Sequence, residues 1–504
     1  MAEDKGLVVN IVLVGSNPMP CYVQAAYLMD ENRQEREILP VPDIHFFVHT
    51  KVTQPYADSI KNMLIEKYGL KVKEDNLVGI EIEDETKQSA IQEKIISIFS
   101  NEILKGKSIY KVILNNTGGT KAMTTYATIA VREWCREKST SLIESYLDDG
   151  TKKLNCVRLG NGENGWGLQG YASYPEEKNL SYFVHLSVAE IGTLYGYKCT
   201  DKNEILQVRP FGNVSTDRKD FENALKVIAE RMFANEDFME KYLKLFARLV
   251  YIKNFKNIAT EICTVEKDFS YKISKKACSS ENILKLFDAE EEKGWFYYDD
   301  KLGLVASTLD GECWTNLFRT MALLPKKKTK KTNNLQEYLT MYRKDWFEEY
   351  VYMVVRDTIE EKKQECDGDM PEVDLLWSLT AKPESRGEGG KKPKDFELDI
   401  VMSVGYELKV LSLTIDNNSL MAEHKFFEAV FRGEMLGGTH SQIIAVNWTE
   451  NGDKLEKQLS SFGGEQYHHI EIWGKEVLDY KTLKKKVKKL LRTEMIEACE
   501  EEEI

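Results

Sequence analysis

The sequence lacks the features that mark several classes of protein. No CxxC pair occurs among its nine cysteines, which argues against a zinc ribbon and against a disulfide framework. No stretch approaches the roughly 20 apolar residues that a membrane-spanning helix requires. The first residues carry no basic segment ahead of a long apolar run, so we expect a cytoplasmic protein that does not associate with a membrane.

Positive charge is also scarce. The 504 residues include 69 Lys and Arg against 82 Asp and Glu, a formal net charge of −13. Net charge governs solubility and long-range steering, whereas local clusters make contacts, so this balance weakens a nucleic-acid role without excluding it. The sharpest basic run, Lys326–Lys331, is typical of a solvated linker, with phosphate contact as the alternative.

Length and hydrophobic content predict several packed domains. A chain of 504 residues exceeds the usual size of one hydrophobic core, and 42% of its residues are hydrophobic. Residues 1–175 alternate strand and helix patterns, beginning with the β-branched run Val8–Val14, which is typical of a strand buried on both faces of a parallel sheet. These repeated units predict an α/β domain with a doubly wound, Rossmann-like sheet.

The rest of the chain divides into two further regions. Residues 176–325 carry mostly helical patterns and end in an aromatic segment, Gly294–Asp300, that predicts a hairpin, so this connecting region is similar to a winged-helix module. Residues 333–504 predict a second α/β domain that starts with the helix Leu335–Lys362. Its expected strands are Val373–Leu379, Phe396–Met402, Gly405–Leu411 and Gln442–Val446, and its later helices are Leu420–Leu436 and 481–492.

A polar, glycine-rich turn follows the strand Tyr110–Leu114. In the segment Asn116–Lys121 (NTGGTK), glycines let the backbone approach a phosphate, threonines supply hydroxyl groups and lysine supplies a charge, at the N-terminus of a helix. A second polar turn, Gly15–Pro18, should open on the same edge of the sheet, where ligands of such folds bind. The spacing matches neither a P-loop nor GxGxxG, and a purely structural glycine turn is the alternative.

The last domain carries a candidate hydrolytic centre. Glu407 and Lys409 share one face of an expected strand, because side chains alternate along strands. If that strand forms a hairpin turning near Ser403–Val404, Asp399 comes opposite the pair. Carboxylates bind Mg²⁺ or Mn²⁺, and a lysine stabilises developing negative charge, so the set predicts metal-assisted phosphodiester hydrolysis. Glu348, on the preceding helix, is a further candidate ligand or base; a solvated strand face is the alternative for the ExK pattern.

Together these motifs resemble the ancillary nucleases of type III CRISPR systems, in which a CRISPR-associated Rossmann fold (CARF) sensor is joined to a restriction-endonuclease-like PD-(D/E)xK domain. The GSNP turn at residues 15–18 and the NNTGGTKAM segment at 115–123 are similar to the CARF ligand loops. The segments Trp346–Glu348, Glu397–Asp399 and Glu407–Lys409 are similar to the WLE, ExD and ECK motifs of the nuclease part, with Leu408 in place of cysteine. The stretch Ser187–Tyr197 fits the middle of those proteins.

The resemblance implies a function for both ends of the chain. A homodimer would bind a cyclic oligoadenylate, with cyclic tetra-adenylate as the expected ring, and would then cleave single-stranded DNA or RNA or nick DNA. The implied ring-binding residues are Ser16, Asn17, Pro18, Thr50, Lys51, Asn116, Thr117, Gly118, Gly119, Thr120 and Lys121. The implied catalytic residues are Glu348, Asp399, Glu407 and Lys409, with the three carboxylates as metal ligands. A ligand-controlled transcription regulator with a decayed nuclease domain, and a ring nuclease that destroys the cyclic oligoadenylate, are the alternatives.

Overall fold

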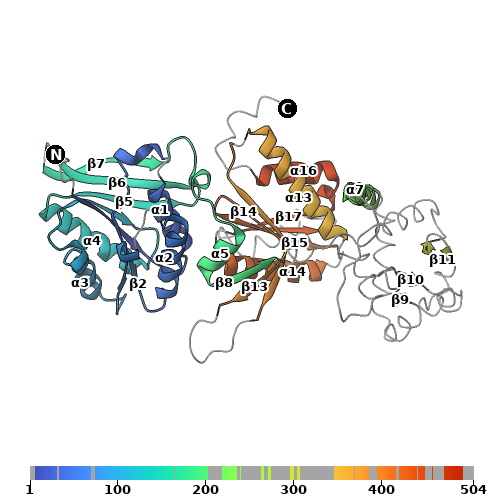
Figure 1. Cartoon of the computed structure of the whole chain (residues 1–504), viewed down its shortest axis with the longest axis horizontal. Coiled ribbons are helices and arrows are strands. Elements are labelled where there is room, and N and C mark those ends of the chain that lie inside the picture. Colours follow the sequence, from blue (N-terminus) through green and yellow to red (C-terminus); the bar gives the residue numbers. More distant parts are fainter. Residues whose placement is uncertain are drawn as a thin grey trace.

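The fold is known from a computed structural model. It describes residues 6–30, 33–69, 74–163, 165–201, 218–234, 239, 263–265, 271–273, 296–299, 303–306, 346–367, 369–384, 394–415, 419–439, 441–448, 457 and 470–491. Within these residues the chain is a mixed α/β protein with a seven-stranded and a six-stranded sheet, as the sequence predicts (Figure 1). No helix in this part of the chain is long and apolar enough to cross a membrane.

The first sheet carries the N-terminal Rossmann-like domain. Its strands follow the order β3-β2-β1-β4-β5-β6-β7, parallel from β3 to β5 and antiparallel at β6 and β7. The strands are β1 (Leu7–Leu13), β2 (Ile44–His49), β3 (Leu77–Glu81), β4 (Ile109–Asn115), β5 (Ser141–Asp148), β6 (Lys153–Gly162) and β7 (Gly165–Tyr174). The helices are α1 (Met19–Met29), α2 (Gln54–Tyr68), α3 (Gln88–Ile98) and α4 (Lys121–Glu137).

Two separate cores explain why β1 is apolar at nearly every position. Val8 and Val12 pack on the face that α1 and α2 cover, whereas Ile11 and Leu13 pack on the face that α3 and α4 cover. The parallel strand is therefore buried on both sides, which a continuous β-branched run satisfies. The adjoining strands β2 and β4 lie on opposite sides of β1, so the strand order reverses there and creates a topological switch point.

The second sheet forms the C-terminal domain, in the order β17-β16-β15-β14-β13-β8. Its strands are β8 (Tyr197–Asp201), β13 (Val373–Pro383), β14 (Phe396–Val404), β15 (Glu407–Thr414), β16 (Gln442–Asn447) and β17 (Ile470–Trp473), and its helices are α5 (Val188–Tyr195), α13 (Trp346–Glu365), α14 (Ser419–Gly437) and α16 (Tyr480–Leu490). α5 and α14 cover one face; α13 and α16 cover the other. β8 falls in the segment expected to be a connecting region, yet it pairs with β13.

The connection between the two domains is packed rather than extended. Helix α5 contacts both α2 and α14, and one hydrophobic cluster runs from the α1–α2 face of the first sheet through α5 to the α14 face of the second. Figure 1 shows α5 between the two sheets, next to β8 at the edge of the second sheet. This continuity links the α1–α2 face of the first sheet to the second sheet through packed side chains.

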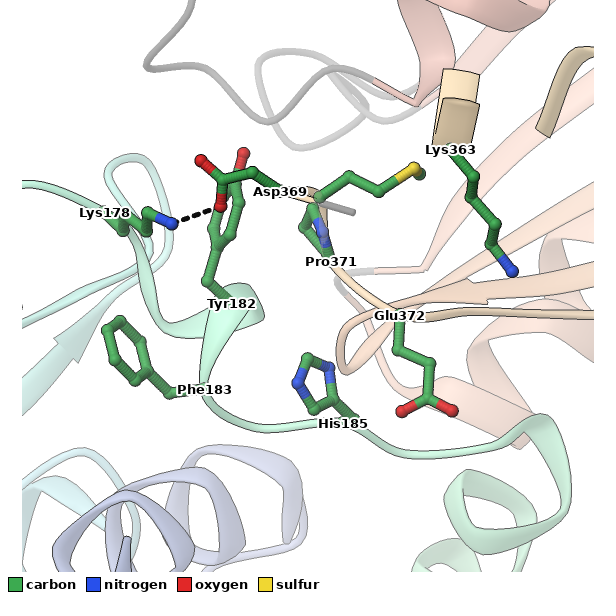
Figure 2. A pocket seen from close by; sticks show the side chains of 9 residues that line it. Lys178, Tyr182, Phe183, His185, Lys363, Asp369, Pro371 and Glu372 are labelled. Atoms are coloured by element: carbon green, nitrogen blue, oxygen red, sulfur yellow. Dashed lines mark hydrogen bonds and ion pairs between the residues drawn. The ribbon is translucent and has the colours of Figure 1, made fainter. Parts of the chain in front are cut away.

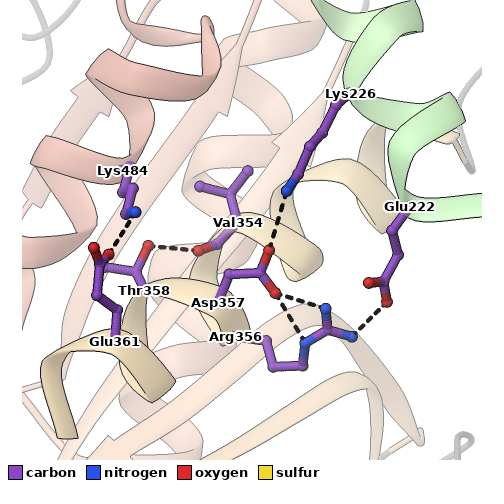
Figure 3. A network of polar contacts seen from close by, with 8 residues as sticks. All are labelled: Glu222, Lys226, Val354, Arg356, Asp357, Thr358, Glu361 and Lys484. Atoms are coloured by element: carbon purple, nitrogen blue, oxygen red, sulfur yellow. Dashed lines mark hydrogen bonds and ion pairs between the residues drawn. The ribbon is translucent and has the colours of Figure 1, made fainter. Parts of the chain in front are cut away.

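One helix of the middle region is held on the C-terminal domain by ion pairs and by apolar contacts. Helix α7 (Arg218–Ala234) lies beside α13, where Arg356 contacts Glu222 at 2.8 Å and Asp357 at 2.6 Å, and Lys226 contacts Asp357 at 3.6 Å (Figure 3). The expected hairpin is confirmed in the backbone, since β11 (Phe296–Asp299) pairs with β12 (Gly303–Ala306). A further small hairpin joins β9 (Cys263–Val265) to β10 (Tyr271–Ile273). The basic run 326–331 lies outside the described residues.

Candidate functional site

The two predicted phosphate loops touch each other at the switch point. The first follows β1 and the second follows β4, and each depends on glycine for the contact. A Cβ added at Gly15 would stand 2.8 Å from the backbone nitrogen of Gly119, and one added at Gly118 would stand 2.0 Å from the carbonyl oxygen of Leu13. Gly119 has a φ of +80°, which side-chain-bearing residues rarely adopt. Backbone packing therefore requires the two glycines of NTGGTK, whatever the loop binds.

Several polar groups of the second loop build the loop itself. The Thr117 hydroxyl accepts a 2.8 Å hydrogen bond from the backbone N–H of Leu147, and Asn116 Oδ1 accepts one of 3.3 Å from the hydroxyl of Thr128. Thr120 caps helix α4, because its hydroxyl accepts from the backbone N–H of Met123 at 3.2 Å. These bonds hold the start of α4 against the sheet.

Exposed groups surround this fixed backbone. Ser16, Thr120 and Lys121 are exposed, and Lys121 is the first residue of α4. A helix N-terminus offers unpaired N–H groups and partial positive charge, and the lysine adds a full charge beside them. The loops can therefore receive an anion such as a phosphodiester.

Asn17 links the first loop to the second domain. Its Oδ1 accepts a 2.6 Å hydrogen bond from the Tyr195 hydroxyl at the end of α5, and also a 3.3 Å bond from the backbone N–H of Met19. Tyr195 is 9% exposed, and burial raises the pKa of its phenol, so it stays a neutral donor. A Cβ on Gly438, beyond the end of α14, would stand 2.3 Å from the Tyr195 hydroxyl oxygen. The Tyr195 side chain thus touches both the loop after β1 and the residue that follows α14.

The remaining predicted loop residues differ in how exposed they are to solvent. Thr50, directly after β2, is buried. Its backbone N–H donates to the Thr53 hydroxyl at 3.0 Å, and its own hydroxyl accepts from the backbone N–H of Thr53 at 3.2 Å. Lys51 is exposed, and Pro18 is buried at the start of α1. Lys51 is therefore available to a ligand, while Thr50 and Pro18 shape the turns.

A polar row crosses the second sheet at the amino ends of three strands. Lys409 Nζ donates to Gln442 Oε1 at 2.9 Å and lies 4.0 Å from Glu407 Oε2. Gln442 Nε2 donates in turn to Glu471 Oε1 at 3.0 Å. Lys409 is only 6% exposed, and the backbone register that pairs it with Gln442 sets the row. The predicted Glu407–Lys409 pair is therefore real, and it extends to two residues that the sequence reasoning missed.

Asp399 does not join this row, which corrects the expected hairpin. The turn lies at Gly405–Tyr406, and the register pairs Val404 with Glu407 and Met402 with Lys409. The next position beyond Ile400↔Leu411 sets Asp399 opposite Ser412, and Asp399 Oδ2 accepts from the backbone N–H of Leu413 at 2.8 Å. Five strand positions separate Ser412 from Glu407, or about 16 Å at roughly 3.3 Å per residue.

The register places Ser412 opposite Asp399, where the predicted centre requires an acid and a lysine. The neighbours of Ser412 on β15 are Leu411 and Leu413, which are 0% and 1% exposed. Lys425 of α14 is the cation nearest to Asp399 in the described ion pairs, at 3.9 Å. Leu411 and Leu413 alternate with Ser412 and pack on the other face of the strand, in the core that α13 and α16 cover. Asp399 therefore faces Ser412 and Lys425, not these leucines.

The three predicted metal ligands do not converge in this arrangement. Glu348 lies in the first turn of α13 and is 8% exposed, but no group of three or more His, Cys, Asp or Glu side chains able to hold a metal ion occurs among the described residues. A single divalent ion requires oxygens about 2.1 Å away, which Asp399 and Glu407 cannot both supply at the separation above. The carboxylates, as placed here, do not fit the shared metal site that the sequence predicted.

Glu407 is tied to the connection between the domains. Its Oε1 accepts a 3.0 Å hydrogen bond from the hydroxyl of Ser181, in the short 3-10 helix η4 (Leu180–Tyr182). Beside η4 is a cavity of about 480 Å³ (Figure 2). It is lined by Lys178, Tyr182, Phe183, His185, Lys363, Asp369, Met370, Pro371 and Glu372. Lys178 and Asp369 form an ion pair across it, and none of the predicted ring-binding residues lines it.

Comparison with known proteins was informative at the level of structure alone. No protein-family model and no curated protein sequence matches the chain. Protein VC1899 from Vibrio cholerae is 13% identical with a TM-score of 0.54, over 96% of this chain and 98% of that one. Can2 from Sulfobacillus thermosulfidooxidans, solved in complex with cyclic tetra-adenylate, is 12% identical with a TM-score of 0.51, over 95% of this chain and 97% of that one. This chain shares their fold.

The residues missed by sequence reasoning left only faint signals. Gln442 is the first residue of an apolar strand, QIIAVN, and Glu471 is the one charged residue of the strand IEIW. Tyr195 lies in the SVAEIGTLYGY stretch, whose sequence alone gives no partner for it. These residues become functional candidates only through pairing register and domain contact.

Proposed function

We propose that this chain is a cyclic-oligoadenylate sensor that controls a domain acting on nucleic acid, in the manner of CARF-type CRISPR ancillary proteins. The observation that carries the proposal is the glycine contact between the loops of Gly15 and Gly118 at the switch point. Can2, which has the same fold, was solved with cyclic tetra-adenylate. The resemblance of the GSNP and NNTGGTKAM segments to CARF loops, stated above, supports the same ligand.

In this proposal the ring's phosphates lie against the start of α4. Lys121 supplies charge, and the first N–H groups of the helix supply donors. Ser16, Lys51 and Thr120 stand on the same edge with exposed side chains. Two copies of the chain related by a two-fold axis would present this surface twice, which suits a ring of matching symmetry, so we infer a homodimer.

Ligand binding would reach the second sheet through contacts that already exist. Asn17 is bonded to Tyr195, and Tyr195 touches Gly438. The Gly438 carbonyl accepts a 3.2 Å bond from the N–H of Ser441, the residue before Gln442 of the polar row. If the ring binds more tightly to one conformation of the Asn17 loop, it would favour the matching conformation of Tyr195, Gly438 and Ser441.

For the effector activity we propose cleavage of DNA or RNA at the polar row. Lys409, at 6% exposure, places a positive charge that would offset the negative charge developing on the phosphoryl oxygens. Glu407, 4.0 Å from it, is the carboxylate that would take the proton of the attacking water. Because Glu348, Asp399 and Glu407 do not converge, no step is assigned to Mg²⁺ or Mn²⁺.

A second candidate function is ligand-controlled binding of nucleic acid without cleavage. It is favoured by Ser412, which stands opposite Asp399 in place of the acid and lysine of the expected centre. A nuclease domain with this replacement would keep its fold and lose its chemistry.

A cleavage assay distinguishes the two. The purified chain is incubated with Mn²⁺ or Mg²⁺ and labelled single-stranded DNA or RNA, with and without cyclic tetra-adenylate, beside Glu407→Gln and Asp399→Asn. Ring-dependent cleavage lost in Glu407→Gln and kept in Asp399→Asn supports the polar row. Absence of cleavage, together with a ring-dependent change in nucleic-acid affinity, supports the second function. Absence of any response to the ring contradicts the sensor.

A further inference from the structure

Helix α16 carries a line of lysines on its outer side. Lys481, Lys485 and Lys489 follow one another at four-residue spacing, and all three are exposed. Four residues at 1.5 Å rise separate successive charges by about 6 Å along one face. The opposite side of the helix is buried by Leu483, Val487 and Leu490 in the core of the second domain.

Two other lysines of α16 are already neutralised. Lys484 lies 2.5 Å from Glu361 of α13, and Lys488 lies 2.7 Å from Glu365 (Figure 3 shows the Lys484 contact). These pairs fix the rotation of α16 on α13. Within the described part of the chain, no ion pair involves Lys481, Lys485 or Lys489, so their charges face outward.

The line of lysines ends near the polar row. Lys488, one residue before Lys489, contacts Glu365, the last residue of α13. The chain continues from there into β13, whose first residue, Val373, pairs with Val404, the partner of Glu407 in register. The C-terminal turn of α16 therefore lies at the end of the second sheet that carries Glu407.

We propose that Lys481, Lys485 and Lys489 form a contact surface for the phosphate backbone of a single-stranded nucleic acid. The assignment rests on the proposed function, because the surface leads toward the polar row. In a chain with a net charge of −13, three unneutralised lysines in line are a local feature, and a backbone with one charge per nucleotide matches their linear arrangement. The apolar side of α16 is buried in the core, so the helix offers a partner its exposed lysines and no apolar face.

Binding is measured by fluorescence anisotropy with a labelled single-stranded DNA of 20 nucleotides, in EDTA so that no metal-dependent cleavage interferes. The test variant combines Lys481→Gln, Lys485→Gln and Lys489→Gln. The control variant combines Lys105→Gln, Lys107→Gln and Lys138→Gln, three exposed lysines of the first domain. Circular dichroism and thermal unfolding verify that both variants fold, and titration calorimetry with cyclic tetra-adenylate tests the sensor separately.

The test variant should bind DNA at least tenfold more weakly than the parent, and the control variant should bind like the parent. The slope of log K against log salt should fall in magnitude by about 2, the value for three lost phosphate contacts on a single strand. Equal affinity of the two variants would overturn the proposal, as would equally tight binding of polyglutamate by the parent. If the variants bind DNA equally but the parent binds the ring normally, the lysine surface is wrong and the sensor proposal stands. If the test variant loses DNA binding but the parent does not bind the ring, the sensor proposal alone is wrong.

Discussion

The Tyr195 hydroxyl donates to Asn17 Oδ1 at 2.6 Å and so joins the loop after β1 to helix α5, which packs on the second domain. The same oxygen lies against Gly438, where any Cβ would come within 2.3 Å of it. Gly438 has a φ of +80° and directly follows α14, which ends at Gly437. A displacement of Asn17 on ligand binding would therefore move Tyr195 against Gly438, three residues before Ser441 and the start of β16.

Replacing Tyr195 with phenylalanine should uncouple the domains with little loss of stability. The change removes one neutral hydrogen bond, worth about 1 kcal/mol, while Asn17 keeps the bond from Met19. We expect cyclic tetra-adenylate to alter amide hydrogen exchange at residues 438–442 in the parent and to leave it nearly unaltered in the variant. The measurement is hydrogen–deuterium exchange with and without the ring.

A matched control for this variant lies within the first domain. Tyr27 donates a 2.8 Å hydrogen bond to Glu35, and both residues precede the connection. Tyr27→Phe also removes one tyrosine hydroxyl, but the exchange response at 438–442 should persist. If both variants lose the response, or neither does, the Asn17–Tyr195 contact is not the coupling element.

Gly118 should be intolerant of even one added methyl group. In Gly118→Ala the new Cβ would meet the Leu13 carbonyl at 2.0 Å, and backbone cannot yield as a side chain can. We expect a loss of about 1–3 kcal/mol in unfolding free energy, measured by urea denaturation, together with weaker ring binding. Gly167→Ala in β7, where nothing lies within 4 Å, is the control. Equal stability of the two variants would refute the close contact of the loops.

Stability of the first domain should depend on pH through His45. Burial lowers the pKa of His45 to about 4, below the unfolded value near 6.5. Its Nδ1 lies 3.1 Å from the side-chain nitrogen Nδ2 of Asn10. The unfolded chain therefore binds a proton first as pH falls, so His45 stabilises the fold fully above pH ~6.5 and loses about 3 kcal/mol of that contribution by pH ~4.

The check compares urea denaturation of the parent and of His45→Gln at several pH values. The unfolding free energy of the parent should fall more steeply between pH 6.5 and 4 than that of the variant. The same slope in both proteins would show that His45 is not held neutral by the fold.

The sequence predicted the elements of both domains better than it predicted the candidate nuclease centre. Strands such as Val8–Val14 and Phe396–Met402 are strongly apolar, and glycine turns end them, so hydrophobic periodicity located them to within a few residues. Loop positions at the sheet edge followed from parallel topology, which explains why Gly15 and Gly118 were expected on the same edge. Local pattern carries this information because it reflects burial and backbone conformation.

The hairpin register could not be read from local pattern. A turn at Ser403–Val404 and a turn at Gly405–Tyr406 are compatible with the same apolar strands, yet they move the partner of Asp399 by several positions. The contacts of Tyr195, Gln442 and Glu471 likewise join segments far apart in sequence, and nothing in the neighbouring residues encodes them. Long-range pairing therefore decided which predicted site residues meet.

Binding of cyclic tetra-adenylate tests the central claim most directly. Titration calorimetry with the purified chain and with Lys121→Ala, beside Lys138→Ala from the other end of α4, measures affinity and stoichiometry. The account predicts saturable binding of one ring per two chains, weakened at least tenfold in Lys121→Ala and unchanged in Lys138→Ala. Absence of binding by the parent, or equal affinity in all three proteins, would contradict it.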